Sequence, residues 1–169
     1  LNVEGTLFRI LTILPHSIIW ININLKNAFP SEVIKTEILK GLENLNIKRE
    51  SDPYESHAFI KSIKGSKQEL KRDQNYALVY PLISHELFYV PVQRGKIISE
   101  IMNQHDVTKQ TLYRLARRYW QRGQNPNALL PDYRNSGAKG KKRTAKDKKL
   151  GRPRIYSSEQ GINVNEYIG

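Results

Sequence analysis

Positive charge is concentrated in the C-terminal half of this 169-residue chain. Residues 109–154 contain 15 Lys and Arg side chains and two acidic ones, whereas residues 1–91 contain 11 basic and 10 acidic side chains. Side chains that all carry positive charge repel one another unless a polyanion neutralises them. The N-terminal half is therefore expected to fold as an ordinary mixed-charge domain, and the C-terminal block indicates a nucleic-acid partner. An anionic membrane surface is the alternative, but the block lacks an apolar face that would insert into lipid.

The composition excludes several classes of protein. The chain has no cysteine, which excludes a disulfide scaffold, a Cys-ligated zinc site, an iron–sulfur cluster and a thiolate nucleophile. Its most apolar stretch, residues 7–25, is interrupted by charged, amide and proline residues, so it predicts no membrane span. No basic start precedes a short apolar core, so we expect no signal peptide.

Residues 1–62 predict a small α+β module. A β-rich stretch over 3–14, turn residues at 14–17 and strict alternation over 18–25 predict an antiparallel hairpin. Pro30 and Ser31 then predict the start of a helix with Ser31 as its N-cap. A short strand is expected over 46–50. His16 and His57 are expected at the surface or in hydrogen bonds, and no residue of the module suggests catalysis.

Residues 66–123 predict a helical domain. One helix is expected over 66–80, and Pro81 should kink or end it. A second helix is expected from Val92 to Gln104, and a third from Thr108, its predicted N-cap, to Arg122, with Gly123 ending it. Two helices joined by a tight turn, the second of them basic, are typical of a helix-turn-helix.

The third helix carries the predicted DNA contacts. An apolar stripe faces the core at Leu112, Leu115, Ala116 and Tyr119. A helix that enters the major groove N-terminus first reads base edges with its first turns. The predicted base contacts are therefore Lys109, Gln110, Thr111, Tyr113, Arg114 and Arg117, and the predicted phosphate contacts are Thr108, Arg118 and Arg122. The alternative is a solvent-exposed basic helix of an ordinary bundle; four arginines without one acid favour DNA.

Residues 124–169 predict an extended basic arm. Turn-forming residues over 124–137 predict neither helix nor strand, and a basic run follows over 138–149. Its predicted phosphate contacts are Lys139, Lys141, Lys142, Arg143, Lys148 and Lys149. The segment Gly151, Arg152, Pro153 and Arg154 resembles the core of an AT-hook, which lies in a narrow minor groove. The alternative for this segment is a basic linker that contacts phosphates.

The run VTKQTLYRLARRYWQRGQNPNALLPDYRNSG, residues 107–137, resembles the TnsB-type DDE transposases. The resemblance implies site-specific binding of double-stranded DNA at repeats in transposon ends, in the bacterial cytoplasm at the nucleoid. It also implies further TnsB protomers on adjacent repeats, and TnsA and TnsC, as partners. In this family a catalytic core follows the DNA-binding region, and its three carboxylates hold two metal ions.

We assign no catalytic residue and no metal ligand to this chain. Its acids after the third helix, Asp132, Asp147, Glu159 and Glu166, lie in predicted turns or in the basic arm. The chain is thus expected to be a DNA-binding fragment that is not an enzyme and binds no cofactor, whereas Mg²⁺ is expected for a full-length transposase. The alternative from another class is a free-standing helix-turn-helix transcription regulator whose N-terminal module senses a signal.

Overall fold

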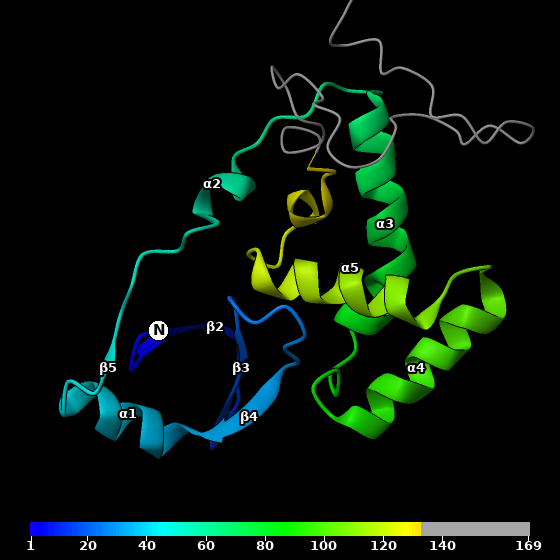
Figure 1. Ribbon diagram of the computed structural model, residues 1–169. Helices are drawn as coiled ribbons and strands as arrows, with labels where there is room; N and C mark the ends of the chain where they lie inside the picture. The colour runs from blue at the N-terminus through cyan, green and yellow to red at the C-terminus, as the bar shows by residue number, and fades with distance from the viewer. Residues whose placement is uncertain (133–169) are drawn as a thin grey trace, which may run out of the picture. The chain divides into compact units, whose positions relative to one another are not determined.

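An antiparallel sheet is followed by helices, as the α+β prediction requires (Figure 1). The computed structural model describes residues 1–132. The strands are β1 Asn2–Val3, β2 Thr6–Ile13, β3 Ser17–Asn22, β4 Ser31–Ile34 and β5 Ile47–Lys48. The helices are α1 Lys35–Glu43, α2 Glu55–Ala58, α3 Lys67–Ile83, α4 Pro91–Gln104, α5 Lys109–Gln121 and the short 3₁₀ turn η1 Pro126–Leu129.

The predicted hairpin is confirmed by strands β2 and β3. They pair antiparallel in a sheet of order β4-β3-β2-β1-β5, and the register shifts between Ile10 and Thr12. The backbone N–H of Leu14 donates to the Ser17 carbonyl at 2.9 Å, which closes the turn. Because β3 alternates, Ile19 and Ile21 are fully buried on one face of the sheet while Ile18 packs on the other.

The predicted helix start at Ser31 is wrong. Residues Ser31–Ile34 form strand β4, which pairs with β3 through Trp20↔Ser31 and Ile18↔Val33, and α1 begins only at Lys35. The physical reason is tertiary: the β-branched Val33 and Ile34 extend the sheet at a free edge, and that pairing outweighs the local capping signal of Ser31. The short strand predicted over 46–50 is confirmed as β5, Ile47–Lys48.

The helical part follows the predicted order with two differences. Helix α3 runs through Pro81 to Ile83, beyond its predicted end at residue 80, so the proline does not end it; a kink at Pro81 stays a prediction. The segment after α5 was predicted without helix, but η1 forms there because the Asn125 side chain caps it, accepting from the Ala128 N–H at 3.2 Å. Ala128 and Leu129 are fully buried, and this burial against α3 and α5 stabilises the turn.

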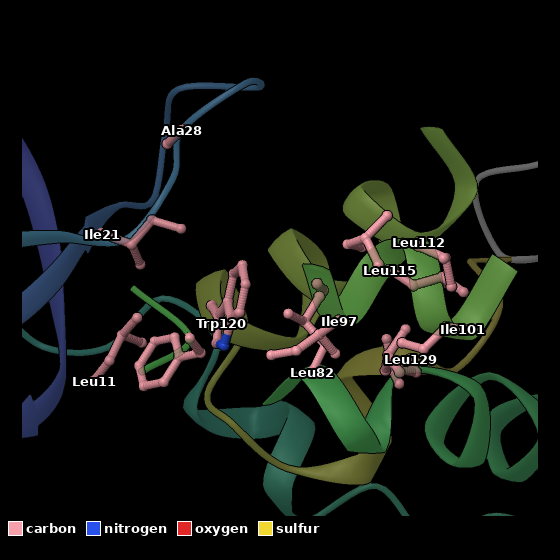
Figure 2. Packing of buried hydrophobic residues seen from close by; sticks show 14 of the residues in the cluster. Leu11, Ile21, Ala28, Leu82, Ile97, Ile101, Leu112, Leu115, Trp120 and Leu129 are labelled. Atoms are coloured by element: carbon pink, nitrogen blue, oxygen red, sulfur yellow. The ribbon is translucent and has the colours of Figure 1, made fainter. Parts of the chain in front are cut away.

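The structure has two apolar cores. The smaller core lies between α1 and one face of the sheet and contains Ile18, Ile38 and Ile47. The larger core joins the other face of the sheet to the helices, and Figure 2 shows Leu11 and Ile21 with Trp120 of α5 and Leu82 of α3 in the same cluster. Residues Leu1–Pro131 form one compact unit. The sheet therefore packs against α5 within this unit. The domain boundaries predicted at residues 62 and 123 stay predictions.

Candidate nucleic-acid interface

Helix α5 presents one polar face and buries the other. Thr108 is its N-cap, as predicted: its Oγ1 accepts from the Thr111 N–H at 3.3 Å. The buried stripe contains Leu112, Leu115, Ala116 and Trp120. The sequence analysis placed Tyr119 in this stripe; Tyr119 is half-buried beside Tyr76, and Trp120 is the fully buried residue.

The first turns of α5 form the exposed basic part of this face. Lys109, Gln110 and Arg114 are exposed and Thr111 is half-buried. No Asp or Glu occurs between Asp106 and Asp132 in the sequence. Because the opposite side of the helix is fixed in the core, these side chains project from a rigid element.

Tyr113 and Arg117, two of the predicted base contacts, contact the loop between β3 and β4. Arg117 donates from Nη1 to Asn27 Oδ1 at 3.1 Å, and its guanidinium carbon lies 5.1 Å from the centre of the Phe29 ring. The Tyr113 and Phe29 rings meet edge to face, with centres 5.1 Å apart. Tyr113 and Arg117 thus pack against the N-terminal module, and Lys109 Nζ lies 5.8 Å from the centre of the Tyr113 ring.

Arg94 of α4 is a buried cation that the sequence analysis did not single out. Its Nη1 donates to the carbonyls of Phe88 at 3.2 Å and Tyr89 at 3.1 Å, and its guanidinium carbon lies 4.5 Å from the Phe29 ring centre. Burial lowers the pKa of Arg94. Two arginines, Arg94 and Arg117, therefore hold one aromatic ring of the β3–β4 loop. The sequence contains a signal for this burial: Arg94 is followed by Ile97, Ile98 and Ile101 at i+3, i+4 and i+7, so it lies on the apolar stripe of α4.

Arg118 and Arg122, two predicted phosphate contacts, support the C-terminal end of α5. Arg118 donates from Nε to the Ala128 carbonyl at 2.9 Å and from Nη2 to the Leu130 carbonyl. The guanidinium of Arg122 lies over the Tyr54 ring, 5.7 Å from its centre. The Arg118 hydrogen bonds hold η1 and Leu130 against α5, and the Arg122 contact is with Tyr54, the residue that precedes α2. Any contact with phosphate by these two arginines stays a prediction.

Polar side chains tie the end of α5 to the sheet. Gln121 donates from Nε2 to the carbonyls of Asn22 and Leu25, each at 2.9 Å, and Gln124 donates from Nε2 to the Leu11 carbonyl at 3.3 Å. Arg9 donates to both carboxylate oxygens of Asp52 and to the Gln121 carbonyl. The orientation of α5 relative to the sheet is therefore set by hydrogen bonds as well as by the core.

The predicted arm contacts lie outside the described residues. They are Lys139, Lys141, Lys142, Arg143, Lys148, Lys149, Gly151, Arg152, Pro153 and Arg154.

Within residues 1–132, no three His, Asp or Glu side chains come together in a way that could hold a metal ion. His16 is exposed, and His57 is half-buried with an Nδ1 that has no hydrogen-bond partner. Over the same residues, no helix has both the length and the apolar character needed to cross a membrane.

Comparison with known proteins identifies the family. The family model described as the TnsB N-terminal SH3-like domain matches residues 1–53, and the one described as the TnsB second domain matches residues 72–133. The transposon Tn7 transposition protein TnsB of Escherichia coli is 35% identical over 162 residues, which are 95% of this chain and 23% of that protein. The chain thus spans about a quarter of the length of this relative and corresponds to its N-terminal part. It belongs to the TnsB family and carries that family's N-terminal SH3-like domain followed by its second domain.

Proposed function

We propose that this chain binds double-stranded DNA sequence-specifically at repeats in transposon ends and so positions a TnsB-type transposase. The observation that carries the proposal is the exposed start of α5, where Lys109, Gln110 and Arg114 project from a helix whose other side is buried. An α-helix fits the major groove, where Arg and Lys pair with guanine and Gln pairs with adenine.

Packing supports this use of α5. Side chains that discriminate bases must be held in a fixed geometry, and α5 is fixed by Trp120 in the core and by Gln121 on the sheet. Arg114 is exposed and lies one turn beyond Gln110, so the two can follow neighbouring base pairs in one groove. A good bidentate pair contributes about 1–3 kcal/mol of discrimination between bases.

The partners proposed for the assembled protein follow from the family. They are transposon-end DNA, further TnsB protomers on adjacent repeats, and TnsA and TnsC; the Escherichia coli relative is named as a transposition protein. The chain matches only the N-terminal 23% of that relative. Its proposed contribution is binding alone.

The experiment compares duplexes from the ends of the transposon that encodes the chain with scrambled duplexes of equal length and composition. Binding by fluorescence anisotropy should prefer the end duplex, and Arg114→Ala should reduce that preference by about 5- to 150-fold, the equivalent of 1–3 kcal/mol. Arg49→Ala is the matched control, since Arg49 is an exposed arginine of the N-terminal module. Equal affinity of the wild-type chain for both duplexes would contradict the proposal.

A further inference from the structure

The loop between β3 and β4, residues 23–30, is an ordered element. Asn22 Oδ1 accepts from the backbone N–H groups of Asn24 and Leu25, each at 2.9 Å. The backbone N–H of Ala28 donates to the Leu25 carbonyl at 3.1 Å, and Ala28 is buried. Hydrogen bonds within the loop and the burial of Ala28 therefore hold the loop in this conformation.

This loop runs alongside α5. Gln121 binds the carbonyls of Asn22 and Leu25, and Arg117, one helical turn earlier, binds Asn27. Both anchors lie on the polar side of α5, the side from which Gln110 and Arg114 also project. The loop consequently borders the face of α5 that is proposed to enter the major groove.

The chemistry of the loop tip suits a polyanion. Lys26 is exposed and takes part in no ion pair among the described residues, and Asn24, two positions earlier in the loop, is also exposed. No Asp or Glu occurs between Glu4 and Glu32 in the sequence. The loop and the start of α5 together present Lys26, Lys109 and Arg114 without a neighbouring carboxylate in either segment.

We propose that the β3–β4 loop is a second DNA-contacting element, with Lys26 on the phosphate backbone at the edge of the groove that α5 enters. The proposal rests on the proposed function of α5. A helix with its side chains is about 10–12 Å across and the major groove about 12 Å wide, so α5 fills the groove. The loop packs against the second half of α5, at Arg117 and Gln121, so it would lie where the helix leaves the groove, over the phosphates at the rim. Such contacts fix the register of the protein without reading sequence.

The test uses the full chain with Lys26→Ala and, as matched control, Lys40→Ala. Lys40 is an exposed lysine of α1, which packs on the other face of the sheet. Lys26→Ala should weaken binding to end and scrambled duplexes by the same factor. It should also reduce the slope of log K against log salt by about 0.9, the loss of one phosphate contact. Lys40→Ala should change neither quantity.

A second measurement uses the absence of cysteine from the chain. Lys26→Cys and Lys40→Cys each create a single thiol, to which an iron–EDTA group is attached for tethered cleavage of bound end duplex. Cleavage is expected from position 26 at the backbone beside the α5 site, and none above background from position 40.

The outcomes separate the two proposals. The loop proposal is overturned if Lys26→Ala leaves affinity and salt slope as Lys40→Ala does and if position 26 gives no cleavage. The proposed function of α5 still stands in that case, provided that Arg114→Ala reduces the preference for the end duplex. If the wild-type chain shows no preference for the end duplex, both are overturned.

Discussion

The Nε atom of Arg9 on β2 donates a 3.1 Å hydrogen bond to the backbone carbonyl of Gln121, the last residue of α5 and 112 positions away in the chain. The same guanidinium binds both oxygens of Asp52, in the segment that connects β5 to α2. One side chain therefore joins the sheet, this connecting segment and the end of the helix that is proposed to read DNA. The two family domains are linked by specific contacts as well as by the chain.

Arg9→Ala should destabilise the chain by about 1.5–3 kcal/mol, the range for hydrogen bonds to charged groups. The substitution leaves the Asp52 carboxylate and the Gln121 carbonyl without this donor. Urea unfolding measures the effect, with Arg49→Ala, an exposed arginine of the same module, as control. A midpoint for Arg9→Ala as high as that of the control would show that the contact contributes nothing.

Acid should remove the contribution of Asp52. Hydrogen bonds from Arg9 hold the pKa of the Asp52 carboxyl below its usual value of 3.8, and the Tyr54 N–H lowers it further. Because the folded pKa is the lower one, the stabilisation is fully present above the unfolded pKa near 3.8 and is lost as the pH falls through the folded value. The free energy of unfolding of the wild-type chain should fall more steeply below about pH 4 than that of Asp52→Asn. Parallel curves for the two proteins would argue against the ion pair.

The sheet and the helices should unfold together. The chain has two tryptophans: Trp20 stacks on Phe8 with ring centres 4.2 Å apart, and Trp120 lies in the core shared by Leu11 and Ile21. Trp20→Phe and Trp120→Phe leave one fluorescent probe each, the first in the helical core and the second in the sheet. Each remaining tryptophan should change its emission over the same denaturant range as the far-ultraviolet circular dichroism of the same variant, because one core joins both parts. A fluorescence transition separated from the circular dichroism transition in either variant would mean that the two parts unfold independently.

Sequence reasoning succeeded where the signal is local. The alternation of Ile19 and Ile21 predicted β3, and Thr108 predicted the start of α5, because each pattern depends on residues a few positions apart. It failed at Ser31, where pairing with Trp20 across the sheet outweighs the capping preference. Local signals carry no information on such a distant partner.

The candidate site shows the same division. The exposed positions of Lys109, Gln110 and Arg114 follow from helical periodicity alone. The contacts of Arg117 with Asn27 and Phe29 depend on a loop 90 residues earlier in the chain, and periodicity cannot indicate which side of a basic helix another module covers.

A further prediction concerns the Gly-Arg-Pro-Arg segment, residues 151–154, and rests on the sequence alone. Replacing A·T pairs opposite the arm by G·C widens the minor groove and adds the guanine amino group. The wild-type chain should lose affinity, and Arg152→Ala should lose much less. An equal response of both proteins would mean that Arg152 does not read the minor groove and that the arm is an electrostatic tether.

Methylation protection on transposon-end duplex tests most directly that α5 reads the major groove. Dimethyl sulfate modifies guanine N7 in the major groove and adenine N3 in the minor groove. The wild-type chain should protect a short run of guanines at N7, and Arg114→Ala, at matched occupancy, should lose protection at one position within that run. Unprotected guanine N7 throughout the bound site, or a protection pattern that Arg114→Ala leaves unchanged, would contradict the assignment of α5 as the DNA-reading helix.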